Sequence, residues 1–440
     1  ISAVANAAST GGALVADAYA DVDTGIYQYA SASTGNSTAT ITNNGGITIS
    51  AVANASGGSN ADATASIETA VYQSAYGSTA AAVLFDNQGS LTVLASANAT
   101  GVTNAEAYAS VTYGLYQYAS AFSGDASVSL INGVAGTAID PATINVGAVA
   151  NASAPEGSAE ATAYLSYLPI YQEATGDLSA SANLENNGTI TISATANANG
   201  EAFAEADATH TYTAIYQSVE STEGSASATI TNNGAINITG TAKAVSVTSS
   251  ASATATLSED GIAQYAFGET SATADLENNG TLTIDFAATA TADDFAEASA
   301  SGETVIAYQS ATAETGSASV SFTNSASGVV DVSFAALANG ASAEADAEIS
   351  EAFYQTAVAE GGNASVTLDN QGALNLALSA TANASASFAD AYASVENAVV
   401  SQYAFGSTGG AGTVEFNNSG TFAVTVQGVA NGATGAEASA

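Results

Sequence analysis

Small apolar residues and polar residues alternate along most of this chain with a period of two. Residues 188–208 read GTITISATANANGEAFAEADA, in which isoleucines and alanines occupy every second position on either side of a break at Asn199 and Gly200. Successive side chains of a β-strand point to opposite faces, so this period predicts strands with one buried and one solvated face. No stretch carries the 3.6-residue period of an amphipathic helix. The pattern therefore predicts an all-β protein.

Two short motifs divide the 440 residues into about nine similar units of roughly 46 residues. One motif has the form Ile-Tyr-Gln-x-Ala, and its successive glutamines are 45, 44, 55, 45, 47, 45, 46 and 47 residues apart. The other is Asn-x-Gly followed by alternating Ile, Leu or Val, and it keeps the same period. The longest spacing reflects an insertion near residues 132–141. A fixed period of this length is typical of repeat architectures.

A unit with about three short strands cannot bury its own apolar face, whereas stacked copies can. The sequence therefore predicts that residues 1–440 form one repeat domain, an elongated, flattened parallel β-solenoid of about nine repeats. The inner face is rich in alanine, so opposite walls must lie close together. One coil per repeat is favoured over two, because each unit has a single Asn-x-Gly corner. A β-propeller is the alternative, although propellers usually have about four to eight blades.

The strong net negative charge of the chain argues against several classes of function. The chain has 41 acidic residues, one lysine (Lys243), one histidine (His210) and no arginine, which gives a formal net charge of -40. Nucleic acids and anionic membrane surfaces are poor partners for such a chain, because both are bound through Lys and Arg. No apolar run is long enough to span a bilayer. A catalytic base paired with a nucleophile does not recur, so we expect a protein that is not an enzyme.

The repeat motifs resemble those of a known group of proteins. Residues 41–45 and 230–234 both read Ile-Thr-Asn-Asn-Gly, and residues 25–27 read Gly-Ile-Tyr. This combination resembles the β-strand repeats of large bacterial surface proteins, such as autotransporter passengers and haemagglutinin-type adhesins. The resemblance implies a β-solenoid that is extracellular or on the bacterial cell surface. The long Ala-x-Ala-x-Ala stretches and the length of the unit depart from the usual pattern.

Stacked units place equivalent residues in columns, and two columns carry amides. The glutamines share the parity of apolar neighbours, so we expect them to point inward and to form a hydrogen-bonded amide ladder. They are Gln28, Gln73, Gln117, Gln172, Gln217, Gln264, Gln309, Gln355 and Gln402. The asparagines of the Asn-x-Gly corners are expected to form a second structural column. They are Asn43, Asn87, Asn186, Asn232, Asn278, Asn370 and Asn418.

Tyrosines precede most of these glutamines and are expected on the outer face. They are Tyr27, Tyr72, Tyr116, Tyr171, Tyr216, Tyr308 and Tyr354. Ala263 and Ser401 interrupt the column, but Tyr265 and Tyr403 lie two residues further on, on the same face. An exposed aromatic stripe predicts a contact surface for self-association or glycans. Packing between neighbouring strands explains the stripe equally well.

An acidic residue lies eleven or twelve residues before most of the glutamines, within an alanine-rich strand. The column comprises Asp17, Asp62, Glu106, Glu160, Glu205, Glu297, Glu344 and Asp390, and Glu437 continues it in the last partial unit. Only Ser252 interrupts it. Directly stacked like charges repel each other, and carboxylate oxygens suit calcium. Calcium is the one cofactor that this column suggests. The alternative is a solvated face whose repulsion blocks lateral aggregation.

Two functions remain open. The first is a non-enzymatic extracellular structural protein, such as a surface filament, matrix fibre, adhesin stalk or component of a biofilm matrix, that self-associates through its repeat ladders. The second is an extracellular binding module, for glycans through the tyrosine column or for ice through the threonine columns of residues 189–191 and 281–283. Residues 1–6 resemble residues 426–431, which predicts that both ends fall within a repeat. We therefore expect the native chain to continue or its ends to join other subunits.

Overall fold

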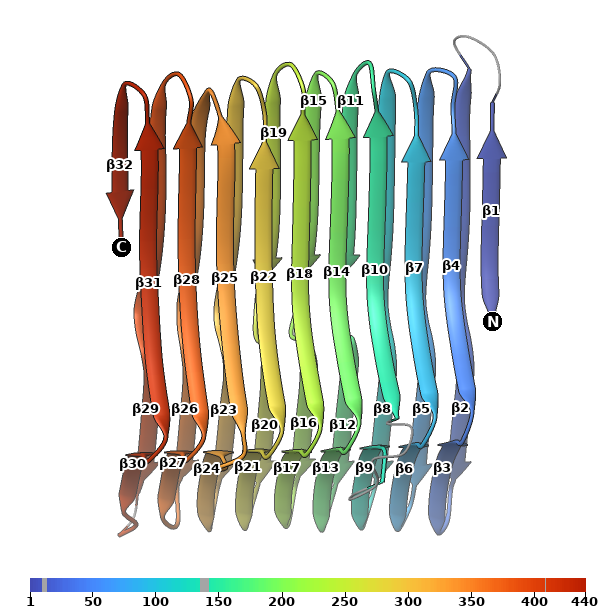
Figure 1. The fold of residues 1–440 in the computed structure, drawn as a ribbon. Helices are drawn as coiled ribbons and strands as arrows, with labels where there is room; N and C mark the ends of the chain where they lie inside the picture. The colour runs from blue at the N-terminus through green and yellow to red at the C-terminus, as the bar shows by residue number, and fades with distance from the viewer. Residues whose placement is uncertain (10–13, 135–141, 408) are drawn as a thin grey trace.

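A computed structural model describes residues 1–9, 14–134, 142–407 and 409–440. The described residues form strands joined by short connections, and none of them belongs to a helix that could cross a membrane. The strands lie in three parallel sheets that run the length of the molecule (Figure 1). This arrangement confirms the predicted all-β parallel solenoid.

The chain visits the three sheets in a fixed order in every coil. Sheet A has ten strands: β1 (Ser2–Ala8), β4 (Gly46–Ser56), β7 (Ser90–Thr100), β10 (Thr143–Ala154), β14 (Thr189–Gly200), β18 (Ala235–Ser246), β22 (Thr281–Thr291), β25 (Val329–Gly340), β28 (Ala373–Ala384) and β31 (Thr421–Gly432). Sheet C has nine shorter strands: β3 (Asn36–Asn43), β6 (Ala80–Asn87), β9 (Asp125–Asn132), β13 (Ser179–Asn186), β17 (Ser225–Asn232), β21 (Ser271–Asn278), β24 (Ser317–Asn324), β27 (Ala364–Asn370) and β30 (Gly412–Asn418).

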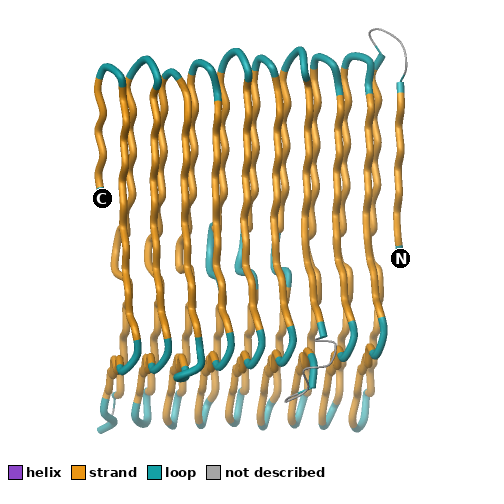
Figure 2. The backbone as a smooth tube through the Cα atoms, viewed as in Figure 1, coloured by secondary structure: helices purple, strands orange, loops and turns teal. Residues whose placement is uncertain are grey.

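Sheet B connects the other two and contains the longest strands. Its thirteen strands are β2 (Val15–Ala32), β5 (Asn60–Gly77), β8 (Asn104–Ala121), β11 (Ser158–Leu165), β12 (Ile170–Gly176), β15 (Phe203–His210), β16 (Ile215–Ser221), β19 (Ser250–Leu257), β20 (Ile262–Gly268), β23 (Phe295–Ala313), β26 (Ser342–Ala359), β29 (Phe388–Gly406) and β32 (Gly435–Ser439). In three successive coils the long strand is split by a short loop, at residues 166–169, 211–214 and 258–261 (Figure 2). Sequence reasoning did not anticipate these interruptions.

Each repeat forms one coil, as the single corner per unit predicted. Gln73, for example, lies directly beside Gln28, which is 45 residues earlier in the chain. Alternate residues are buried along strands such as β14 and β17, so there the period-two pattern is the pattern of burial, whereas the long strands of sheet B, such as β5 and β8, interrupt it near their middle. One apolar core lies mainly between sheet A and the first half of sheet B. A second, built from alanine and valine, lies between sheet C and the second half of sheet B.

The insertion near residues 132–141 follows strand β9, and residues 135–141 lie outside the described residues. The match of residues 1–6 with residues 426–431 is wrong by two positions. The sequence match pairs Asn6 with Asn431, but the residue of the last coil that is in register with Asn6 is Val429. The column between them includes Asn54 and Lys243. A sequence with a period of two matches itself well when it is displaced by two residues, and this caused the error.

Candidate functional site

The glutamines form one unbroken ladder through the interior. From Gln73 to Gln402, each side-chain Nε2 donates to Oε1 of the glutamine in the preceding coil, at 2.8–3.3 Å. The same nitrogen also donates to a backbone carbonyl of sheet C, such as Thr229 for Gln217 at 3.0 Å. Seven of the nine, Gln73 to Gln355, are completely buried. The amides therefore tie each coil to its neighbour and tie sheet B to sheet C.

The corner asparagines form a second ladder, with the opposite direction of donation. Each Nδ2 donates to Oδ1 of the asparagine in the following coil, from Asn43 to Asn418, at 2.7–2.9 Å. Two members, Asn132 and Asn324, were missed from the sequence because no glycine follows them at the second position. Their column could still have been found from the distance to the preceding glutamine of the motif, which is 14 to 16 residues in every unit.

The tyrosines lie on the outer face of sheet B and stack on one another. Eight rings form the tyrosine ladder, in the order Tyr27, Tyr72, Tyr116, Tyr171, Tyr216, Tyr265, Tyr308 and Tyr354. Neighbouring ring centroids are 4.6–5.4 Å apart, and most ring planes are within 18° of parallel. Tyr265 fills the place that Ala263 leaves empty. The ring faces are covered by neighbouring rings, so a sugar cannot stack face-on within the ladder.

Three further tyrosines depart from this regular stack. Tyr113, Tyr167 and Tyr212 lie next to the ladder at the interrupted part of sheet B, and their rings meet one another or ladder rings at 59–89°. This cluster is a local departure from the repeat.

The acidic residues are in register in every coil. Strand pairing joins Asp17 to Asp62 and continues through Ser252 to Glu437 without a shift. The carboxylates are on the solvent-facing side of sheet B. Burial, followed by repulsion from Glu106, raises the pKa of Asp62 and of Glu160. Among the described residues, no three acidic or histidine side chains converge to hold a metal ion. Calcium binding between neighbouring carboxylates remains a prediction.

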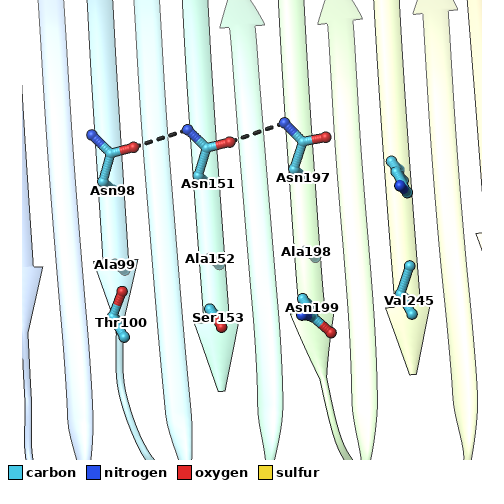
Figure 3. Close-up of a pocket in the computed structure, with 11 residues that line it drawn as sticks. Asn98, Ala99, Thr100, Asn151, Ala152, Ser153, Asn197, Ala198, Asn199 and Val245 are labelled. Carbon is cyan, nitrogen blue, oxygen red and sulfur yellow. Dashed lines mark hydrogen bonds between the residues drawn. The ribbon is translucent and has the colours of Figure 1, made fainter. Parts of the chain in front are cut away.

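The outer face of sheet A carries a groove of about 370 Å³ near the ends of strands β7, β10, β14 and β18, lined by both amide and alanine side chains. Its floor includes a third amide ladder, in which Asn151 donates to Asn98 at 2.9 Å and Asn197 donates to Asn151 at 2.9 Å (Figure 3). Lys243, the only lysine of the chain, continues the column and lines the groove. A similar groove of about 430 Å³ follows Asn339, Asn383 and Asn431.

The single histidine is part of the core. His210 is fully buried, its Nε2 lies 3.0 Å from the carbonyl oxygen of Thr239, and its ring meets Phe286 edge-on. Burial lowers the pKa of His210 to about 4, so the ring is neutral at physiological pH. Leu165 and Leu257 take the same place in the adjoining coils. His210 therefore replaces an apolar residue.

The threonine columns proposed for ice binding are interrupted. Strand β18 lies between strands β14 and β22 and puts Ala235 and Asn237 where its neighbours have threonine. This agrees with the interruption that the sequence shows, and it leaves no continuous threonine array across these three coils.

Comparison with known proteins gives no relative: no family model matches this chain, and neither a curated protein nor a solved structure is significantly similar to it.

Proposed function

We propose that this chain is a non-enzymatic structural protein of the cell exterior, which forms part of a surface filament, matrix fibre or adhesin stalk. The observation that carries the proposal is the use of its polar columns. The glutamine and corner asparagine amides bond to their equivalents in the adjacent coil, from one end of the stack to the other. Residues that recur in every coil and bond mainly to themselves support a scaffold rather than one reaction centre.

The surface chemistry supports the same proposal. A net charge of -40 and the row of carboxylates along one face of sheet B oppose side-by-side association, which favours joining of molecules end to end along the stack. The chain lacks cysteine and methionine, the side chains that oxidants damage most readily. A scaffold exposed to an oxidising exterior benefits from the absence of cysteine and methionine.

Electron microscopy of the native material tests the proposal. Fibres in which this chain is a main component, with strands perpendicular to the fibre axis, are the expected result. Dispersed particles with the dimensions of a single chain would count against a filament, and turnover of a substrate by the purified chain would count against a purely structural role.

Glycan binding is the second candidate, and the two grooves on sheet A are the observation that favours it. Each groove presents a row of asparagine amides, and the first also presents the hydroxyls of Thr100 and Ser153 and the ammonium group of Lys243. Such groups can bond to sugar hydroxyls. A glycan array probed with the wild-type chain and with Asn151→Ala tests this function: binding that the variant loses supports it, and no binding by either protein excludes the tested glycans.

A further inference from the structure

The tyrosine ladder is a continuous row of aromatic rings through eight coils. It passes from Tyr27 on strand β2 to Tyr354 on strand β26, and no neighbouring centroids are more than 5.4 Å apart. Rings at this separation are close to van der Waals contact. An electron can therefore pass between neighbouring rings without crossing backbone or solvent.

Composition makes these rings the main target of a one-electron oxidant. The chain has no cysteine, methionine or tryptophan, and it has 19 tyrosines. Cysteine and methionine are normally oxidised before other residues. In their absence, the phenol is the most easily oxidised side chain that the protein offers.

One ladder position also has a proton acceptor. The phenol of Tyr171 donates a hydrogen bond to a carboxylate oxygen of Glu173, which is on the same strand. Burial raises the pKa of Tyr171 and of Tyr116, so both phenols keep their protons in neutral solution. Oxidation of Tyr171 therefore requires loss of a proton with the electron, and Glu173 is placed to take it. Tyr116 is the nearest ring, at 4.6 Å.

We infer that the tyrosine ladder is an oxidative modification site, at which a one-electron oxidant joins adjacent coils covalently through Tyr116 and Tyr171. The oxidant removes one electron from each ring, and each phenol loses its proton, in the case of Tyr171 to Glu173. The two tyrosyl radicals form a bond between ring carbons ortho to the oxygens. Each ring is then a dienone, and its ortho carbon passes its hydrogen to the carbonyl oxygen of the same ring, which restores the phenol. Overall, two phenols become one dityrosine, two protons are released and the oxidant accepts two electrons.

If solvent exposure alone decided which tyrosines an oxidant modifies, the product would be different. Tyr19 and Tyr403 are 65% and 54% exposed, and among the described residues neither ring stacks on another. An oxidant that reacts only where it collides would modify these residues first and would join separate chains. Tyr27, at the end of the ladder, is equally open at 65% exposure. It gives the oxidant contact with the stack, from which the electron vacancy passes inward.

The test uses the full chain, a photoexcited ruthenium polypyridyl complex as oxidant and persulfate as electron acceptor, at low protein concentration. Because the chain has almost no basic residues, the product is digested with a protease that cuts at acidic residues, and Glu156 and Glu160 lie between the two expected peptides. Mass spectrometry should find a dityrosine that joins Tyr116 to Tyr171 within one chain. Absence of dityrosine, or linkage mainly between chains through Tyr19 and Tyr403, would overturn the inference.

Three variants separate the ladder from general oxidation. Tyr171→Phe keeps the stacked ring but removes the phenol, and it should abolish the linkage. Glu173→Gln keeps both phenols and should lower the linkage yield, whereas an unchanged yield would overturn the role of Glu173. Tyr403→Phe, outside the ladder, should leave the yield unchanged. Circular dichroism before oxidation establishes that each variant is folded, so a lost linkage is not a lost fold.

Discussion

At the scale of single residues, an interior amide stabilises the fold through three partners at once. Gln217 donates to Gln172 at 2.8 Å and to the carbonyl of Thr229 at 3.0 Å, and it accepts from Gln264 at 2.9 Å. The substitution Gln217→Leu fits the apolar surroundings but takes one hydrogen-bond partner from each of the three groups, of which Gln264 keeps its bond to the carbonyl of Asp275. A buried orphaned group costs roughly 1–3 kcal/mol. We therefore expect a large loss in the free energy of unfolding, measured by chemical denaturation.

The end of the same ladder provides the control. Gln402 is only partly buried and bonds to one neighbouring glutamine, Gln355. Water can replace its partner, so Gln402→Leu should cost clearly less than Gln217→Leu. Equal losses for the two variants would show that the interior ladder is not what stabilises the stack.

His210 predicts a separate dependence on pH. Its pKa falls from 6.5 to about 4 on folding, so the stability that its neutral form contributes is present above pH 6.5 and is lost as the pH falls toward 4. The variant His210→Leu copies the leucines of the adjoining coils and removes this loss. Relative to wild type, it should gain about 2 kcal/mol in stability between pH 8 and pH 5. A difference that is the same at both pH values would contradict a buried neutral histidine.

At the scale of the strand and its corner, glycine is required because coils approach closely. A Cβ atom on Gly234 would lie 2.0 Å from the carbonyl oxygen of Gly188 in the preceding coil. Gly45 is at the equivalent corner of the first coil, and a Cβ there would meet nothing within 4 Å. Gly234→Ala should therefore lower the melting temperature markedly, whereas Gly45→Ala should change it little. Similar effects for both would mean that backbone flexibility, rather than contact between coils, selects glycine.

The elements show what a single sequence can and cannot predict here. Alternation identified the inner faces, and the two motifs identified one coil per repeat, because each is a local signal repeated many times. The loops that split sheet B were not predicted. Residues 211–214 carry no strong turn signal, although Pro169 and the Asp260-Gly261 pair do mark the other two loops. The displaced match that paired Asn6 with Asn431 shows why register is harder than fold. A chain that alternates with a period of two specifies which face is buried but distinguishes poorly between registers two residues apart.

The candidate sites divide in the same way. The columns of equivalent residues, such as those of Gln217 and Glu205, were predictable from the spacing of the repeats in the sequence, because equivalent positions of successive coils must stack. Ring geometry was not, since whether Tyr116 exposes a face or an edge depends on side-chain rotamers. The grooves on sheet A also escaped notice, because a hollow lined by Asn151 arises from the shape of the whole sheet.

At the scale of the whole molecule, the excess of negative charge predicts greater stability in mild acid. Burial raises the pKa of Asp260 to about 7 and that of Asp346 to about 6, from ordinary values of 3.8. Raised carboxyl pKa values contribute stability that is fully present below pH 3.8 and is lost as the pH rises through 6 to 7. The melting temperature should therefore be higher at pH 6.5 than at pH 8. Asp260→Asn should weaken this trend, and a melting temperature that falls from pH 8 to pH 6.5 would contradict it.

Calcium provides a second test of the charged surface. Neighbouring coils are about 4.8 Å apart, so the column carboxylates lie within the Debye length of about 8 Å at physiological salt. If calcium bridges them, it should raise the melting temperature more than sodium does at equal ionic strength. Replacing the column with serine, which Ser252 already provides in one coil, should remove the difference. Identical effects of the two ions would identify the column as a solvated face.

Cryo-electron microscopy of the native material decides whether this solenoid is a building block of a fibre. Ten strands in sheet A correspond to an axial length of about 43 Å for this chain. Fibres with a layer spacing of about 4.8 Å along their axis, into which the coil of three sheets fits, are the expected result. Dispersed single particles about 43 Å thick, with no axial continuation, would contradict it.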